Sequence, residues 1–221
     1  VSNHTELDGF IIQDGNADFA SALGNPANSG AGLFNNGSLN GLSSHPIIRN
    51  CTFLNNHSWG YGGAVLNDGA FDGDANPMFI NCQFENNSAQ NAGGAFYNSG
   101  IFDGEANPSF QNCSFGNNHS DNAQGGAMYN NGGTNGVSSP EFLNCSFSYN
   151  TAGESGGAIY NFANHAGLCE GYFKNCQFDN NIALIGGGLY NDGSFDGECN
   201  PTFDNCIFEK NQATDGDGGG I

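Results

Sequence analysis

Phe and Cys return along this chain with a period of about 31 residues, inside a segment of the form Phe-x-Asn-Cys-x-Phe. The copies of this segment begin at Phe79, Phe110, Phe142, Phe173 and Phe203, with the variant Ile-Arg-Asn-Cys-Thr-Phe at Ile48. A Gly-Gly-Ala segment followed by an apolar residue, or Gly-Gly-Gly-Leu in the last copy, begins at Gly62, Gly93, Gly125, Gly156 and Gly186. A fixed period indicates one structural unit stacked on copies of itself, so it predicts a solenoid.

The first segment reads as a strand with a bend in it. Strict alternation would place Phe79 and Asn81 on one face, and Cys82 and Phe84 on the other. The residue after the first Phe is Arg, Ile, Gln, Leu, Lys or Asp in different copies, which is typical of a solvent position. Phe79, Cys82 and Phe84 can then all face inward only if the strand bends at Asn81. Asn tolerates the left-handed backbone conformation, so we expect the bend there.

Each turn of the solenoid should contain this strand, a turn built on Asn-Asn, a Gly-Gly-Ala strand and a longer return loop. Stacking would place Phe84 near Phe53 and Phe115, at the strand spacing of about 4.8 Å. An α solenoid is disfavoured, because two Asn, two Gly and usually a Pro in each period are poor helix formers. The sequence predicts an all-β parallel β-helix of about seven coils of roughly 31 residues, formed by residues 1–221 as a single domain.

The charge balance restricts the kinds of partner. The formal net charge is −19, and the only basic residues besides His are Arg49, Lys174 and Lys210. Nucleic-acid binding needs clustered Lys and Arg, so this class is excluded, and anionic membrane surfaces are disfavoured. Cations, neutral glycans and basic partners remain open. No apolar stretch approaches the about 18 residues of a membrane span, and we expect the sequence to be a piece of a longer chain.

A family resemblance rests on two motifs that alternate along the chain. Phe-x-x-Asn, at Phe53, Phe84, Phe115, Phe147, Phe178 and Phe208, alternates with Gly-Gly-Ala plus an aliphatic residue. This alternation resembles the repeats of chlamydial polymorphic outer-membrane proteins and the right-handed parallel β-helix regions of large secreted bacterial surface proteins. Leu7 to Gly15 is similar to the coil often found near the start of such regions. The resemblance implies a right-handed β-helix at the cell surface, but it specifies the fold better than the function.

Six cysteines occur once per repeat at the same register, and we expect them to form an inward column. A column of small buried hydrophobic residues without bridges is the expected arrangement, since buried free Cys packs well. Metal binding is excluded because the chain has no Cys-x-x-Cys or Cys-His spacing. The column consists of Cys51, Cys82, Cys113, Cys145, Cys176 and Cys206.

Cys169 and Cys199 differ from the column, because each lies seven residues before a column Cys, in a return loop. Equivalent positions on adjacent coils are close enough for a disulfide, whose Cα separation is about 4.4 to 6.8 Å. We expect a Cys169–Cys199 disulfide, which would imply an oxidising, extracellular setting. Two free loop thiols are the alternative.

The return loops contain Asp-Gly-Asp-Ala-Asn-Pro and close variants. Turn chemistry explains most of this pattern, since Asp and Asn cap turns, Gly takes positive φ and Pro fixes the entry into the next strand. Stacking would also bring carboxylates of adjacent coils together, and hard oxygen ligands so arranged suit Ca²⁺. Ca²⁺ is therefore the one cofactor that the sequence suggests, with turn chemistry alone as the alternative. Its candidate ligands are Asp72, Asp74, Asp103, Glu105, Asp196 and Glu198.

For function, the sequence favours a non-catalytic extracellular scaffold, such as a surface stalk or an adhesin passenger. Its partners would be glycans or other cell-surface proteins. A polysaccharide lyase or hydrolase is the enzymatic alternative, since parallel β-helices host such enzymes, but the three cations lie far apart along the chain and carboxylate pairs are too common to be specific. A subunit of an end-to-end filament is a third hypothesis, because strand edges at the ends of a solenoid invite stacking.

Overall fold

The protein is a parallel β-helix, described here from a computed structural model. The structure describes residues 5–18, 28–39, 41–216 and 218–221, and its regular elements are all β-strands. The strands form four parallel sheets, A to D, one along each side of the coil.

Sheet A contains β1 (Glu6–Asp8), β5 (Ile47–Arg49), β9 (Met78–Ile80), β13 (Ser109–Gln111), β17 (Glu141–Leu143), β21 (Tyr172–Lys174) and β25 (Thr202–Asp204). Sheet B contains β2 (Ile11–Gln13), β6 (Thr52–Leu54), β10 (Gln83–Glu85), β14 (Ser114–Gly116), β18 (Ser146–Ser148), β22 (Gln177–Asp179) and β26 (Ile207–Glu209). Sheet C contains the two-residue strands β3 (Asn16–Ala17), β7 (His57–Ser58), β11 (Ser88–Ala89), β15 (His119–Ser120), β19 (Thr151–Ala152), β23 (Ile182–Ala183) and β27 (Gln212–Ala213). Sheet D contains β4 (Leu33–Asn36), β8 (Val65–Asp68), β12 (Phe96–Ser99), β16 (Met128–Asn131), β20 (Ile159–Ala163) and β24 (Leu189–Gly193).

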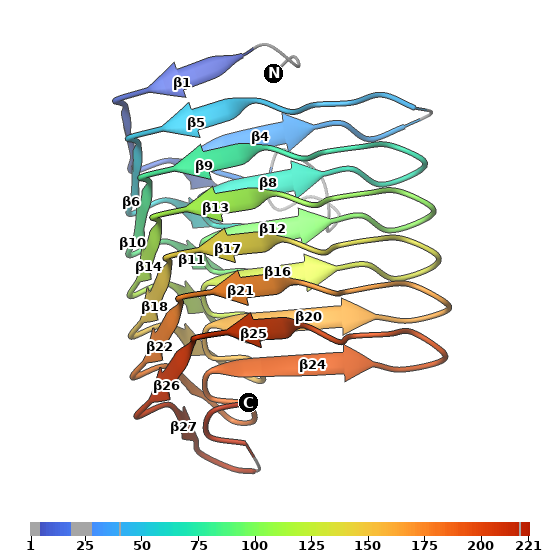
Figure 1. Cartoon of the computed structure of the whole chain (residues 1–221). Coiled ribbons are helices and arrows are strands. Elements are labelled where there is room, and N and C mark those ends of the chain that lie inside the picture. The colour runs from blue at the N-terminus through green and yellow to red at the C-terminus, as the bar shows by residue number, and fades with distance from the viewer. Residues whose placement is uncertain (1–4, 19–27, 40, 217) are drawn as a thin grey trace.

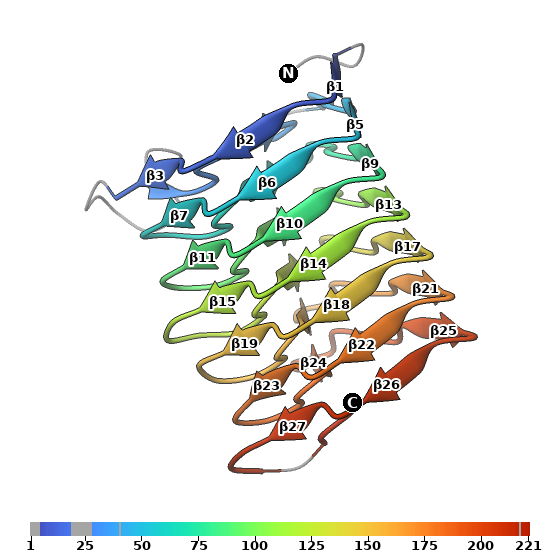
Figure 2. The same ribbon diagram turned by 90° about the vertical axis from the view of Figure 1, so that its left-hand side faces the viewer.

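The chain passes through sheets A, B, C and D in order, and a return loop then leads to sheet A of the next coil (Figure 1). Figures 1 and 2 together show that the chain turns clockwise as it moves away from a viewer at the N-terminal end, so the helix is right-handed. Six complete coils and the first three strands of a seventh are described. The register pairs Met78 with Ile47 and with Ser109, about 31 residues away in each direction, which confirms the predicted fold and period.

The corner between sheets A and B is the predicted Asn bend. Asn81 has φ 54°, and its equivalents in the other full repeats also have positive φ. The side chains of this Asn column are bonded along the outside of the coil: Asn81 Nδ2 donates to Asn50 Oδ1 at 3.1 Å, and Asn112 Nδ2 donates to Asn81 Oδ1 at 3.1 Å. The bend brings Phe79, Cys82 and Phe84 all into the core, as expected.

The corner between sheets B and C contains the Asn-Asn pair, and the two Asn residues have different structural roles. The first, such as Asn117, has positive φ. The second, such as Asn118, points inward and is fully buried. Asn118 Nδ2 donates to Phe84 O at 2.9 Å and to Asn150 Oδ1 at 3.0 Å, while its Oδ1 accepts from the backbone and the side-chain nitrogens of Asn87. Sequence reasoning expected only a turn here and missed this buried amide ladder.

Two columns of stacked Phe rings fill the core between the sheets. Phe84 stacks on Phe53 and on Phe115 with centroid separations of 4.8 and 4.6 Å, and neighbouring columns meet edge to face, as for Phe79 and Phe84 at 5.6 Å. Both arrangements are favourable for aromatic quadrupoles. The rings are almost completely buried from Phe53 to Phe178, so the core runs without interruption through the stack.

The Gly-Gly-Ala segment leads into sheet D, and each of its residues has a separate steric reason. The first Gly, such as Gly93, has φ +65°, which disfavours any other residue. A Cβ on the second, Gly94, would overlap the carbonyl oxygen of Gly126 in the next coil. The third, Ala95, is fully buried against the Phe columns. The motif therefore lets the wall of the coil approach its core and its neighbour.

We predict that Asn118→Ala lowers the free energy of unfolding by about 3 kcal/mol, because it leaves buried partners on Asn87 and Phe84 unsatisfied. Urea unfolding followed by circular dichroism measures this loss. Asn112→Gly is the matched control, since it removes an exposed ladder amide and keeps a residue that accepts positive φ, and its cost should stay below about 1 kcal/mol. Equal losses for the two variants would contradict the assigned role of the buried ladder.

We also predict that Gly94→Ala destabilises the protein by about 3 kcal/mol or more, through overlap with the Gly126 carbonyl. Gly116→Ala in β14 is the control, because the atoms nearest its Cβ belong to the movable carboxylate of Glu85. That substitution should change the melting temperature little. If Gly94→Ala has the same melting temperature as the parent protein, adjacent coils do not approach closely enough at Gly94 to exclude a Cβ.

Candidate functional site

The outer face of sheet D carries a ladder of tyrosines. Because side chains alternate along a strand, Phe96 of β12 points into the core while Tyr97 points outward. Tyr97 stacks on Tyr129 with centroids 5.1 Å apart, and the ladder continues through Tyr160 to Tyr190. Tyr61, from the turn before sheet D, lies 4.6 Å from Tyr97 at its N-terminal end.

Two hollows meet at Tyr61 and Tyr97. One has a volume of about 490 Å³ and extends toward the return loops. The other has a volume of about 310 Å³ and extends toward the turns between sheets C and D. They share three lining residues, so we describe them as one surface feature, the sheet D groove. The residues of its larger hollow are Tyr61, Leu66, Asp68, Ala70, Phe71, Tyr97, Ser99, Ile101 and Asn131.

The groove exists because side-chain size changes from coil to coil. Tyr61 is paired in register with Ala92 of the next coil, so a large side chain is followed by a small one. On the other side, Asp68 is paired with Ser99, and both are shorter than the tyrosines beside them. The hollows thus lie where the sequence departs from strict repetition.

Asp68 is the single carboxylate among the residues that line the groove. Burial raises the pKa of its carboxyl group, while a hydrogen bond from the Ala70 backbone nitrogen, 3.1 Å from Oδ1, works in the opposite direction. Tyr97 accepts a hydrogen bond from Asn131 Nδ2 at 3.0 Å, and burial raises the pKa of its phenol. Both groups are therefore desolvated by burial, and each already accepts a hydrogen bond within the protein.

The rim of the groove is the tip of a return loop. Phe71 and Asp72 both have positive φ, 58° and 59°, and Phe102 and Asp103 repeat this conformation on the next coil. The two Phe rings stack with centroids 4.9 Å apart and are 50% and 41% exposed. The left-handed conformation is unusual for bulky residues, so these tips hold exposed aromatic rings in a strained backbone.

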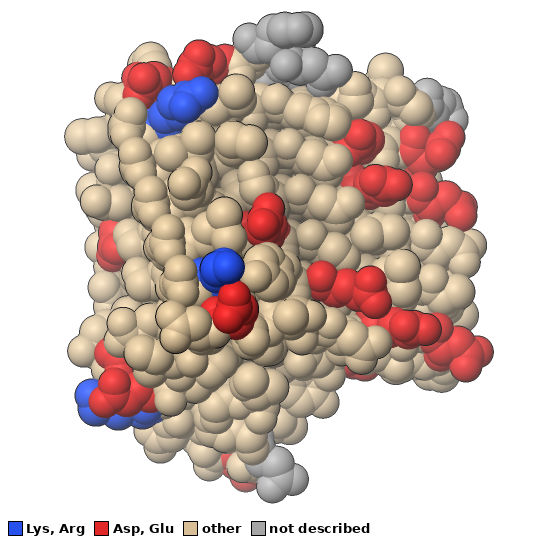
Figure 3. All heavy atoms as spheres, in the orientation of Figure 1, with Lys and Arg blue, Asp and Glu red and all other residues tan. Residues whose placement is uncertain are grey.

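The predicted calcium ligands lie on these return loops, but they do not form one cluster. Asp74 and Glu105 are paired on adjacent coils as expected, whereas Val137 and Leu168 separate Glu105 from Glu198 in the same column. Figure 3 shows acidic side chains gathered over the return loops, at the right of the view, with no Lys or Arg among them.

Within the described residues, no three His, Cys, Asp or Glu side chains are placed to hold a metal ion. Asp74 instead contacts His45 Nε2 at 3.1 Å and accepts from Asn76. The structure therefore shows no calcium site built from Asp72, Asp74, Asp103, Glu105, Asp196 and Glu198, and Ca²⁺ binding by these loops stays a prediction beside turn chemistry.

Cys169 and Cys199 are neighbours, as predicted, but both thiols are free. Cys169 N donates to Glu198 O at 2.8 Å, which places the two residues in equivalent positions. Each Sγ is directed at a carbonyl of its own coil: Cys169 Sγ lies 3.0 Å from Phe162 O, and Cys199 Sγ lies 3.1 Å from Asp192 O. The disulfide is therefore not supported. The thiols continue a column of small residues, with Ala75, Ala106 and Ser138 before them, rather than lying in exposed loops.

The six Cys of the predicted column lie in or against the core, and their thiols are free in the structure. Five members are buried, and Cys206 is half-buried. Each Sγ lies near a carbonyl oxygen of the preceding coil, as Cys82 does with Ile48 O at 3.5 Å. Hydrogen bonding to Cys113 and burial raise the pKa of the Cys82 thiol.

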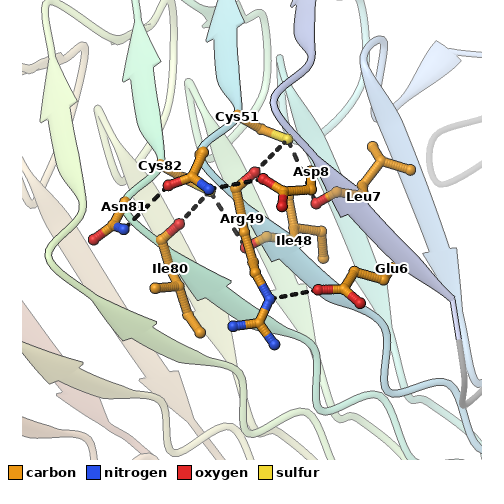
Figure 4. Close-up of polar contacts among 10 residues, drawn as sticks. Glu6, Leu7, Asp8, Ile48, Arg49, Cys51, Ile80, Asn81 and Cys82 are labelled. Atoms are coloured by element: carbon orange, nitrogen blue, oxygen red, sulfur yellow. Dashed lines mark hydrogen bonds and ion pairs between the residues drawn. The ribbon is translucent and has the colours of Figure 1, made fainter.

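All three Lys and Arg side chains are paired with carboxylates on the surface. Arg49 Nε contacts Glu6 Oε1 at 2.6 Å, close to Cys51 and Asp8 (Figure 4). Lys174 and Lys210 contact Asp204 and Glu209 at 3.2 and 3.1 Å. None of these cations lines the sheet D groove.

Sequence reasoning missed the sheet D groove, although a signal was present. Tyr recurs two residues after the last residue of Gly-Gly-Ala, followed by Asn, at Tyr97, Tyr129, Tyr160 and, after Gly-Gly-Gly, Tyr190. A column of exposed-face tyrosines follows from that register together with strand alternation. The position of Ala92 is occupied by Tyr61 in the preceding coil, and this change of side-chain size could have indicated a hollow beside the tyrosine ladder.

The fold and the repeating motifs define a parallel β-helix repeat protein. The family model of the Chlamydia polymorphic membrane protein repeat matches this chain twice, over residues 81–99 and 144–161. Each match begins at the Asn of the corner between sheets A and B and ends within sheet D, so it contains both Phe-x-x-Asn and Gly-Gly-Ala. The chain is thus a β-helix repeat region like that of the polymorphic membrane proteins.

No curated protein and no solved structure matches the chain significantly. In the part of the chain that the structure describes, no helix has the length and apolar character needed to cross a membrane.

We predict that iodoacetamide labels Cys199 and Cys206 first in the native, reduced protein, because these two thiols are half-buried while the other six are buried. Mass spectrometry of peptides after timed labelling measures the order. All eight thiols should react once the protein is unfolded without reductant. If Cys169 and Cys199 alone stay unlabelled in that sample, they are bridged and the free-thiol arrangement is wrong.

Proposed function

We propose that this β-helix is a non-catalytic, adhesive scaffold displayed at the cell surface. The observation that carries the proposal is the match to the polymorphic membrane protein repeat, whose family consists of outer-membrane and surface proteins. Stalks and adhesins share a need for a long, regular framework that holds binding surfaces away from the membrane. The continuous Phe core and the parallel ladders meet that need.

The sheet D groove supports an adhesive role over a purely passive one. It lies on a flat, outward face of the solenoid, and repeat proteins use such extended faces for binding. It combines apolar walls with a few polar groups, which is the usual composition of a binding pocket, and its volume falls within the usual range of about 300 to 1,000 Å³.

A polysaccharide-active enzyme is the alternative that this geometry favours less. Glycoside hydrolysis by the common mechanism needs two carboxyl groups across the bond that is cleaved, about 5 to 9.5 Å apart. Among the residues that line the groove, Asp68 is the only carboxylate. A cationic base is not at hand either, since Arg49, Lys174 and Lys210 are each paired with a carboxylate.

The proposal predicts that the purified 221-residue protein binds to cultured cells in a saturable manner. Fluorescently labelled protein and flow cytometry measure the binding, and protein carrying Gly94→Ala, which should disrupt the coils, is the control for folding. The same preparation should release no oligosaccharides from neutral glycans or polyuronates. Release of oligosaccharides would favour the enzyme, and non-saturable binding equal to that of the disrupted control would contradict adhesion.

A further inference from the structure

We propose that the larger hollow of the sheet D groove binds a lysine or arginine side chain from an extended, basic segment of a partner protein, with its charge against Asp68. This inference deepens the adhesive function proposed above and rests on it.

The lining suits a side chain that is apolar along its stem and charged at its head. Leu66, Ala70 and Ile101 provide apolar walls, and Asp68 is the single charged group among them. Lys and Arg bury their methylene stems against apolar surface while the head keeps a polar partner. The Tyr97 hydroxyl and the Ser99 side chain lie in the same lining and offer oxygen atoms to such a head.

The charge around the hollow is complementary to a cation. No basic side chain lines it, and Asp72 and Asp103 lie exposed at the tips beside its Phe rim. The protein carries a net charge of −19, so a basic segment would be attracted from a distance and then selected by local contacts. Burial raises the pKa of Asp68, while hydrogen bonds from Ala70 and Ser38 lower it, and a bound ammonium or guanidinium group would favour the carboxylate further.

The rim adds an aromatic ring to the hollow. A turn whose two central residues both have positive φ favours Asn and Gly, yet Phe71 and Asp72 occupy these positions. Other return-loop tips, such as Phe195 and Asp196, have the same conformation, so the conformation belongs to the repeat. What is particular to this tip is that the half-exposed ring of Phe71 lines the hollow.

A neutral glycan fits the groove less well. Sugars pack their C–H faces on open aromatic ring faces, but Tyr97 has Tyr129 stacked on one side at 5.1 Å and the tilted ring of Tyr61 on the other at 4.6 Å, measured between centroids. Both faces of Tyr97 are therefore covered by other rings. The experiment below therefore includes a glycan as the competing ligand.

The test uses a blocked octapeptide of alternating Gly and Lys, titrated into the 221-residue protein in 0.15 M NaCl. Its counterpart with Gln in place of Lys is the uncharged control. We expect the Lys peptide to shift the backbone amide signals of Asp68, Phe71 and Ile101 in heteronuclear NMR spectra. Asp68→Asn, which keeps an oxygen for the Ala70 amide, should weaken binding at least tenfold. Asp196→Asn makes the same charge change on a distant loop tip and should leave the affinity within twofold.

A second variant separates binding from folding. Phe71→Asn places a residue that tolerates positive φ at this position, so it should raise the melting temperature of the protein. The same substitution should lower the affinity for the Lys peptide. The proposal is overturned if Asp68→Asn and Asp196→Asn weaken binding equally, if the Gln peptide binds as well as the Lys peptide, or if a chitin or cellulose oligosaccharide shifts the groove signals and the Lys peptide does not.

Cell binding distinguishes this inference from the function beneath it. If Asp68→Asn binds cells as well as the parent protein, the adhesive function stands and the groove is not its site. If the Lys peptide binds the groove but the parent protein shows no saturable binding to cells, the adhesive function fails while the ligand chemistry holds.

Discussion

The parallel, in-register pairing of each coil with the next is the constraint on which the rest of this molecule depends. It satisfies the backbone groups of the strands inside the stack, and it also places each side chain against its own equivalent about 31 residues away. Such stacking is favourable for only a few kinds of side chain. Aromatic rings stack, amides donate to and accept from one another, and Gly or Ala leave room for a neighbour. Most inward columns of this protein consist of these types; the exceptions are the Cys column and the largely aliphatic column of sheet D, which contains Val65, Phe96, Met128, Ile159 and Leu189.

The same constraint explains how far the sequence predicts the structure. The Phe columns, the bend at Asn81 and the Cys column follow from two features that can be read directly from the sequence. These are the repeat length of about 31 residues and the alternation of side chains between the two faces of a strand. The burial of Asn118 does not follow in this way, because it depends on the direction in which the chain leaves sheet B. Likewise, Cys169 has the sequence surroundings of a loop, yet its position in a column of small residues is set by the stacking of the return loops.

The acidic residues show the limit of reasoning from repeats. Asp74 and Glu105 stack as the period predicts, but like charges in adjacent coils repel, and the column continues with Val137 and Leu168. His45 Nε2 lies 3.1 Å from Asp74 on one side, and apolar residues follow Glu105 on the other, so the acidic pair is not extended into a longer acidic column. Repeats that share a motif therefore differ at the positions where identical neighbours would be unfavourable, and those positions carry most of the information about local chemistry.

The sheet D groove arises from such differences. Its hollows need a large residue at Tyr61 followed by a small one at Ala92, and short side chains at Asp68 and Ser99 beside the tyrosine ladder. Because each coil contacts only its neighbours, stability is shared among many similar interfaces, and one coil can vary its outward residues at little cost to the stack. The inward columns therefore preserve the fold, while outward-facing residues can differ between coils and form binding sites. In a protein with 22 acidic residues, the net charge does not show where such a site lies. The partial burial of a single carboxylate is more informative. Asp68 is the carboxylate that lines the groove beside apolar residues.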